Sequence, residues 1–191
     1  PALAELLVQR FLDADPLRID GSAITLPARI AAICATAPPA ASARCFARVR
    51  ALRGRLSGGT TEETDALLRG AERYAAREFD AAAAAWRPLL GGSAPLAAML
   101  PDAMAEVFDA TDNAEIAERV DQAVMQRGAE FGGATMGHVR AARRALLRGD
   151  RARARSLANQ VVVAWQFADQ APPALTEMQH LVRRLDERPP R

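Results

Sequence analysis

The chain has 191 residues, half of them apolar and only 5% aromatic, and its formal net charge at pH 7 is +2. This length suffices for one domain with a sizeable core, and so small a charge gives no support for a nucleic-acid partner. No apolar run reaches the length of a membrane span and no signal peptide is visible, so no membrane partner is predicted. Alanine dominates the apolar residues and favours closely packed helices, which argues against strands.

All 25 basic residues are arginines. Codon usage in a bacterial genome of high GC content explains this bias. The alternative explanation is selection for bidentate contacts of the guanidinium group to carboxylate or phosphate.

Residues 1–59 contain three predicted helices, over 2–14, 25–36 and 40–56, which prolines and a glycine pair separate. Cys34 and Cys45 lie on either side of the proline pair that divides the second helix from the third. We expect both cysteines to be reduced, partly buried residues of a cytoplasmic protein, and a redox pair is the alternative.

Seven further helices are predicted after residue 59. Thr60 and Glu63 form a capping-box pattern, and Asp80, Asn113 and Asp150 are predicted N-caps, because their side chains can accept hydrogen bonds from free backbone N–H groups. The predicted ranges are 61–77, 80–91, 101–110, 113–127, 135–148, 150–168 and 174–185, and a frayed tail is expected over 188–191.

The segment 70–90 has the pattern of a helical hairpin. Gly70 allows a close contact, Phe79 fills the turn, and Ala82 and Trp86 pack the second helix, which Pro88 is expected to kink or to end early. Looser versions follow over 105–124 and 142–161, and the predicted turns lie at 79–80, 112–113 and 149–150. These steps of about 33 and 37 residues bracket the ~34-residue period of helical repeats, in which stacked neighbours share a core.

Residues 61–185 therefore resemble a degenerate tetratricopeptide repeat (TPR) array of three hairpins and a final capping helix. The Gly-Asp turn of the family is matched only by Gly149–Asp150. The residues that match the small and bulky helix positions of the family are Gly70, Ala105, Ala142, Phe108, Ala82, Ala117, Ala154 and Trp86. The residues at such positions that differ from the family pattern are Arg73, Ala145, Asp121 and Ala158. The resemblance implies an all-α fold of antiparallel helical hairpins stacked as an α-solenoid.

We predict a repeat domain over 60–187, preceded by a segment, 1–59, that holds irregular helices or a junction to a preceding domain. The resemblance implies a non-catalytic protein–protein interaction scaffold, as a regulatory or C-terminal part of a larger multidomain signalling protein. The alternative is an all-α effector or small-molecule sensor domain with an apolar pocket around Tyr74, Trp86 and Phe108. An enzyme is disfavoured because neither a nucleophile elbow nor a phosphate loop is present, and no cofactor or metal is predicted.

The resemblance also places the first helix of each hairpin along a concave groove for a protein or peptide. Asp102, Glu106 and Asp109 share one helix face and would select basic groups of the partner. The candidate groove residues are Thr64, Leu67, Tyr74, Asp102, Glu106, Asp109 and Arg143. The alternative interpretation is a solvated acidic face, or one that Arg140 and Arg143 neutralise.

A second candidate surface is a basic stripe formed by Arg140, Arg144, Arg148, Arg151 and Arg155. Seven arginines and one acid lie between residues 138 and 156, and this local segregation carries more information than the net charge. The stripe could meet an acidic protein surface or phosphate. Single-stranded nucleic acid is disfavoured because no aromatic residues alternate with the arginines to stack on bases. Self-association is left open, and His138 is expected to be a structural or surface histidine.

Overall fold

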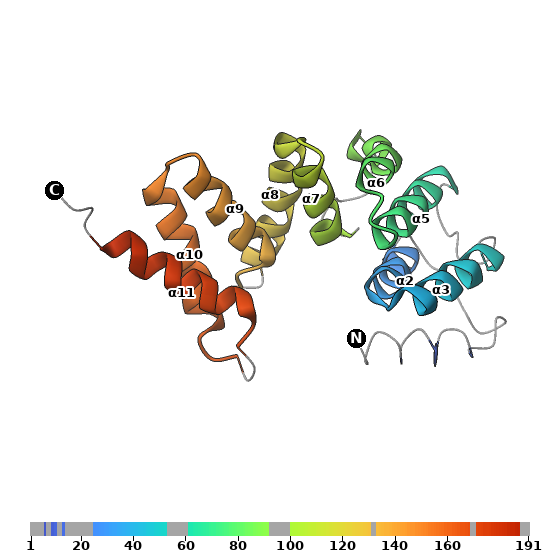
Figure 1. Cartoon of the computed structure of the whole chain (residues 1–191), viewed down its shortest axis with the longest axis horizontal. Coiled ribbons are helices and arrows are strands. Elements are labelled where there is room, and N and C mark those ends of the chain that lie inside the picture. The colour runs from blue at the N-terminus through green and yellow to red at the C-terminus, as the bar shows by residue number, and fades with distance from the viewer. Residues whose placement is uncertain are drawn as a thin grey trace. The chain divides into compact units, whose positions relative to one another are not determined.

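The computed structural model describes residues 25–52, 61–91, 100–130, 133–168 and 171–187, with Leu6, Gln9, Arg10 and Asp13 as isolated positions. All regular secondary structure in these ranges is helical, which confirms the predicted all-α class (Figure 1). The α-helices are α2 (Thr25–Thr36), α3 (Pro39–Ala51), α5 (Thr61–Ala75), α6 (Phe79–Trp86), α7 (Pro101–Ala110), α8 (Ala114–Glu130), α9 (Met136–Leu147), α10 (Arg151–Trp165) and α11 (Pro173–Asp186), and a 3-10 helix, η2, covers Arg87–Gly91.

Three predictions lie wholly or partly outside the described ranges: the helix over 2–14, the cap at Thr60 and the tail over 188–191. The helix predicted over 40–56 is described as far as Leu52, where α3 has ended. Of the described helices, none is both long and apolar enough to cross a bilayer.

The chain divides into two compact units, Pro1–Ala117 and Glu118–Arg191, which we call unit 1 and unit 2. The division falls within α8, whereas the sequence placed its division between residues 59 and 60. Helices α2 and α3 pack against α5 in unit 1, so these N-terminal helices share a core with the first hairpin.

Helix α5 is the centre of unit 1, since it contacts α2, α3, α6 and α7. Gly70 lies where the indole ring of Trp86 on α6 crosses α5, and a Cβ atom at that position would overlap the ring. The Trp86 Nε1–H donates to the carbonyl oxygen of Leu67 at 3.1 Å. Trp86 and Phe108 are completely buried, so the close contact predicted for Gly70 is present.

Cys34 on α2 and Cys45 on α3 form a disulfide with a Cα–Cα distance of 5.5 Å. The expectation that both cysteines are reduced is therefore wrong. The proline pair at 38–39 ends α2 and begins α3, and this turn brings the two fully buried sulfurs together. Spacing along the sequence could not reveal this, because it depends on the angle between the helices.

The hairpin turns share one geometry, in which a left-handed residue follows the first helix of each hairpin. These residues are Arg77 (φ 62°), Asp112 (φ 55°) and Gly149 (φ 79°), which are 35 and 37 residues apart. In each turn the next N–H bonds back to a carbonyl five residues earlier, as in Asp150 to Ala145 at 2.9 Å. This is the Schellman arrangement that commonly ends helices.

One of the predicted N-caps requires correction. Asp80 lies inside the first turn of α6, which begins at Phe79, because Arg77 and not residue 79 makes the turn. Asn113 lies directly before α8, where it was predicted, and its Oδ1 accepts from Nη2 of Arg87 at 3.1 Å, so its side chain connects η2 to the turn before α8. The third predicted cap is confirmed, since Oδ1 of Asp150 accepts from the N–H of Arg153 at 2.9 Å.

Unit 2 has a core of small and medium aliphatic side chains. The fully or nearly buried members are Val139, Ala142, Ala158, Val161, Met178 and Leu181. They come from α9, α10 and α11, and α10 packs against both of the other helices. Thr135 and His138 begin α9 with a capping box, in which the N–H of Thr135 donates to Nδ1 of His138 at 3.1 Å. The predicted structural role of His138 is thus confirmed.

Candidate functional site

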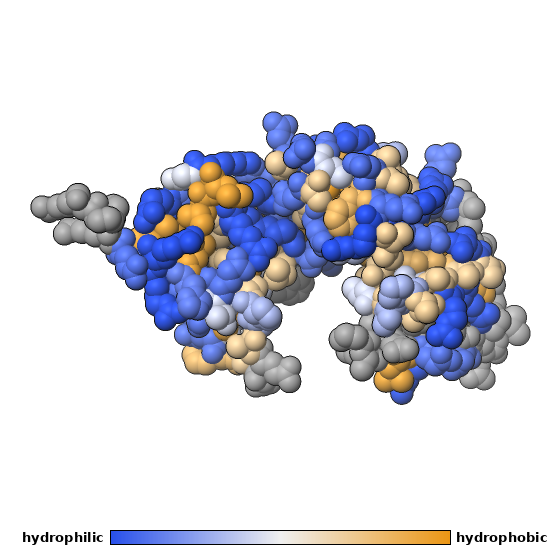
Figure 2. All heavy atoms as spheres, in the orientation of Figure 1, coloured by the Kyte–Doolittle hydropathy of each residue, from blue (hydrophilic) through white to orange (hydrophobic). Residues whose placement is uncertain are grey.

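A groove with a volume of about 760 Å³ lies between α9 and α11 in unit 2. Its lining residues are Arg143, Leu146, Glu177, His180, Leu181, Arg183, Arg184 and Glu187. The members at 177, 180, 181 and 184 follow the spacing of one helix face, so α11 presents a single side to the groove. Figure 2 shows hydrophobic residues beside α11 with hydrophilic residues around them.

Leucines give the groove its apolar part. Leu146 of α9 is half-buried and Leu181 of α11 is buried. The next residue of α9, Leu147, is 86% exposed, the most exposed large apolar side chain in the described ranges together with Phe167. Leu146 and Leu147 therefore keep apolar area in contact with water that an apolar side chain of a partner could cover.

Arg143 and Glu177 connect the two walls of the groove. The Nε of Arg143 donates to Oε1 of Glu177 at 2.7 Å, and Nη2 donates to Oε2. These hydrogen bonds raise the pKa of Arg143 and lower the pKa of Glu177. Both side chains are more than two-fifths exposed, so water screens the pair and it orients the walls more than it stabilises them.

The other charged groups of the groove belong to α11. Nη2 of Arg183 lies 3.2 Å from Nδ1 of His180, within hydrogen-bond distance. Among the described residues, no carboxylate forms an ion pair with Arg183 or Arg184. The groove thus carries two guanidinium groups that keep their charge available to a partner.

The predicted groove residues in unit 1 are only partly brought together. Tyr74 OH donates to Oε2 of Glu106 at 2.7 Å, and Arg77 Nη1 lies 3.2 Å from Oε1 of the same residue. Burial, followed by the hydrogen bond to Glu106, raises the pKa of Tyr74 to about 12, and the charge of Asp102 adds to this rise. Both oxygens of Glu106 are thus engaged within the unit, while Asp109 lies exposed on the same helix.

Thr64 and Leu67 do not line any open surface in this structure. Thr64 is 2% exposed and Leu67 is fully buried. The reason is that α2, α3, α6 and α7 all pack against α5, whereas the sequence interpretation left one side of α5 facing a groove. The prediction that Thr64 and Leu67 contact a partner is therefore wrong, because both residues belong to the core of unit 1.

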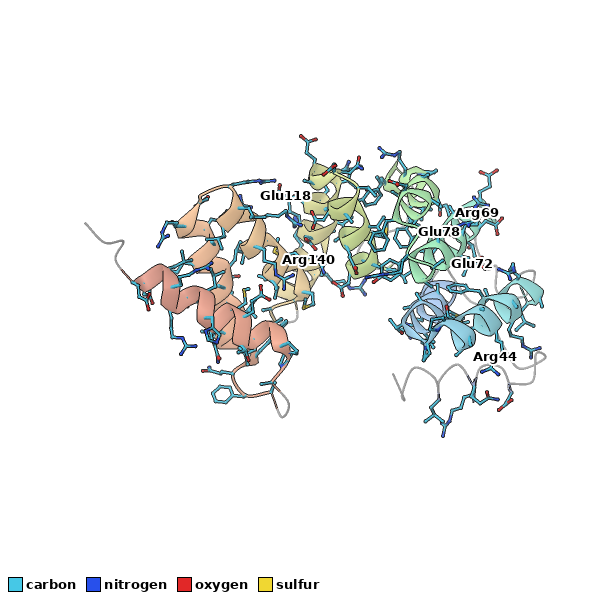
Figure 3. All side chains as sticks on the ribbon, viewed as in Figure 1. Arg44, Arg69, Glu72, Glu78, Glu118 and Arg140 are labelled. Carbon is cyan, nitrogen blue, oxygen red and sulfur yellow. A yellow bond between two sulfur atoms is a disulfide. The ribbon has the colours of Figure 1, made fainter. Side chains whose placement is uncertain are left out.

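The predicted basic stripe is largely engaged by acids of unit 2. Arg140 and Arg144 both form ion pairs with Asp121, which is completely buried; Arg140 Nη2 lies 2.6 Å from it. Arg148 pairs with Glu118 at 3.0 Å, and Figure 3 labels Glu118 on α8 and Arg140 on α9.

The last two residues of the stripe lie on α10. Arg155 Nε lies 2.6 Å from Asp186 of α11, and Arg151 is exposed. Of the twelve predicted site residues, only Arg143 lines the groove between α9 and α11.

Sequence reasoning missed the α11 side of the groove. Leu181, Arg183 and Arg184 were not singled out from the sequence as candidate site residues. A signal was present, since the charged residues at 177, 180 and 184 recur with helical spacing. This spacing indicated a charged face of the last helix, but it did not indicate which helix packs opposite that face.

The apolar pocket considered around Tyr74, Trp86 and Phe108 is filled by these side chains. Tyr74 packs against Phe79 with ring centroids 6.1 Å apart and against Trp86 at 6.2 Å. Within the described ranges, no group of three or more His, Cys, Asp or Glu residues is arranged to hold a metal ion.

Comparison of the chain with protein-family models, with curated proteins and with solved structures returned no match.

Proposed function

We propose that this chain is a non-catalytic interaction module that binds a segment of a protein or a peptide in the groove between α9 and α11. The observation that carries the proposal is the groove itself, which Leu146 and Leu181 line together with two arginines, at 183 and 184, that form no ion pair with a carboxylate among the described residues. Apolar anchors surrounded by charged groups are the usual anatomy of a protein-binding surface. A role within a larger signalling protein stays a prediction.

The TPR-like arrangement is part of this proposal. Three Schellman turns, at Arg77, Asp112 and Gly149, recur at 35 and 37 residues, and each lies between the two helices of a predicted hairpin. Such a period supports repeated hairpins. In that arrangement α9 would be the first helix of the third hairpin and α11 would be the capping helix. The groove would then lie between the first helix of a hairpin and the helix that follows that hairpin.

The compartment of the chain is also open to proposal. The sequence predicted a cytoplasmic protein. The disulfide between Cys34 and Cys45 favours an oxidising compartment instead, because reducing systems keep most cytosolic cysteines as thiols.

The test of the function is a peptide selection followed by mapping. A phage library of random 12-residue peptides is selected against the full chain, and an enriched peptide is titrated into ¹⁵N-labelled protein. We expect the backbone amide signals of α9 and α11 to shift, with those of α5 and α6 unchanged. Enrichment of no peptide, or shifts confined to other helices, would refute the proposal.

A further inference from the structure

We infer that the groove between α9 and α11 selects an acidic partner segment that carries a large apolar side chain next to its carboxylates. This inference deepens the proposed function and depends on it. It names the chemistry of the occupant, which neither the repeat pattern nor the groove volume provides.

The charge of the groove argues for an acidic occupant. Arg143 and Glu177 neutralise each other through two hydrogen bonds. Among the remaining charged residues of the lining, Arg183 and Arg184 then outnumber Glu187. Since guanidinium groups pair with carboxylates in a bidentate geometry, they favour an acidic segment and repel a basic one.

A local hydrogen bond positions the side chain of Arg183 to bind a carboxylate of a partner. Its hydrogen bond to His180, one turn earlier on α11, holds the guanidinium group along the helix surface. A side chain already held in one place loses less conformational entropy when a carboxylate binds. The last turn of α11 also contains both arginines, where cations are favoured by the helix dipole, so the folded state tolerates their charge without a partner.

The leucines argue for an apolar side chain in the same segment. Leu146 lines the groove and is only half-buried, and the next residue, Leu147, is 86% exposed at the end of α9. A free acidic small molecule would leave both of these leucines in water. An acidic segment with a leucine, isoleucine or phenylalanine covers them and meets the arginines at the same time.

The test uses the enriched peptide and a matched peptide in which each Asp and Glu is replaced by Asn or Gln. Fluorescence anisotropy measures the affinity of both for the full chain and for the variant Arg183→Glu/Arg184→Glu. We expect the neutral peptide to bind about tenfold more weakly than the acidic one, and the double variant to lose most of that difference. Raising the salt concentration should weaken only the acidic peptide.

Three controls keep the outcome specific. Arg151→Glu makes the same change of charge at an exposed position of α10 outside the groove, and should leave the affinity within about twofold. The milder variant Arg183→Gln/Arg184→Gln removes the charge without reversing it, and thermal unfolding shows whether each variant is folded. An equal loss in Arg151→Glu would mean a general charge effect and would overturn the inference.

The failure of the inference can be told apart from the failure of the proposed function. Neutral or basic peptides that bind the groove, by the amide shifts, would overturn the acidic occupant and retain the function. The absence of any groove-binding peptide would overturn both. A dimer of the chain alone that Arg183→Glu/Arg184→Glu dissociates, measured by sedimentation, would replace the peptide with a second copy and overturn the inference as well.

Discussion

The two units of the chain are stabilised by different interactions. Unit 1 packs large aromatic rings, with Trp86 against the bare backbone at Gly70, and it contains the disulfide. The core of unit 2 contains mainly alanines and valines, and ion pairs connect its helices. In two of these pairs the fully buried Asp121 contacts Arg140 and Arg144.

This difference explains where binding chemistry can be found. Unit 1 uses the charges of its predicted acidic face internally, since Tyr74 and Arg77 engage both oxygens of Glu106. Unit 2 engages its arginines on α9 in the same way but leaves Arg183 and Arg184 at the end of α11 without acidic partners among the described residues. A charge-rich sequence is thus a poor guide to a binding surface until the partners of each charge are known.

The largest effect is expected for Trp86→Ala, which should break the aromatic core of unit 1. Deletion of a fully buried tryptophan costs about 3–5 kcal/mol, a large part of the stability of an ordinary domain. Hydrogen exchange measured by mass spectrometry should become fast in α5, α6 and α7 and change little in α10 and α11.

The matched control is Gly91→Ala. A Cβ atom there meets nothing within 4 Å, so the stability should change by no more than about 0.5 kcal/mol. Equal acceleration of exchange in both units after Trp86→Ala would show that the aromatic core supports the whole chain and would end the distinction between the units.

In unit 2 the corresponding test is Asp121→Ala. The substitution leaves Arg140 and Arg144, each only about a tenth exposed, without their shared carboxylate, and breaking a buried ion pair from one side costs about 3–5 kcal/mol. Urea unfolding followed by the fluorescence of Trp165, in a Trp86→Phe background, should show the loss. Glu118→Ala is the control, because its pair with Arg148 is exposed and should contribute within about 1 kcal/mol. Equal effects of the two variants would contradict the role of Asp121.

Reduction of the disulfide should affect unit 1 alone, since both cysteines of the chain belong to it. Closing the short loop between Cys34 and Cys45 stabilises the fold by about 3 kcal/mol according to loop entropy. Dithiothreitol, or the double variant Cys34→Ala/Cys45→Ala, should lower the unfolding temperature of α2 to α6 and leave that of α9 to α11 unchanged. A thiol assay first shows that the untreated protein has no free thiol. If dithiothreitol then leaves the unfolding temperature unchanged, the disulfide adds nothing to the stability of unit 1.

Local patterns in the sequence were sufficient for much of the fold. Proline and glycine positions bounded the helices well, and Gly70 and Trp86 marked the first hairpin, because a helix crossing needs one small and one large residue. The cap at Asp150 was correct for the same reason, since a cap involves residues three apart. The turn after α5 was misplaced because Arg77, a residue that rarely adopts positive φ, occupies the left-handed position.

The candidate site was harder to predict because it depends on distant pairs. Asp121 and Arg140 are 19 residues apart and Arg143 and Glu177 are 34 apart, and no spacing rule connects them. The disulfide was missed for a similar reason, as it depends on the angle at which α2 meets α3. Faces of helices are readable from one sequence, whereas the identity of what lies opposite a face is not.

The smallest effects are expected from changes of pH. Alkaline pH should lower the stability of unit 1, and acidic pH should lower the stability of unit 2. In unit 1 the pKa of Tyr74 is raised from 10.0 to about 12. The folded state therefore holds this proton more tightly than the unfolded state, and stability should fall as the pH rises from 10 to 12. Tyr74→Phe should cost about 1 kcal/mol at pH 7 through the lost hydrogen bond to Glu106, and should remove the alkaline slope. An unchanged slope in this variant would place the alkaline sensitivity elsewhere.

Unit 2 should respond to acid instead. Burial lowers the pKa of His138 below 6.5, so the unfolded chain takes up this proton first and stability falls as the pH drops below 6.5. Hydrogen bonds from Arg143 and Arg148 lower the pKa values of Glu177 and Glu118 below 4.5, which adds a second loss at more acidic pH. His138→Gln keeps an acceptor at the third position of the capping box, and should flatten the first phase while the second remains. Because each exposed pair contributes at most about 1 kcal/mol, a steep cooperative loss near pH 6 that survives His138→Gln would mean that another group controls the acid response of unit 2.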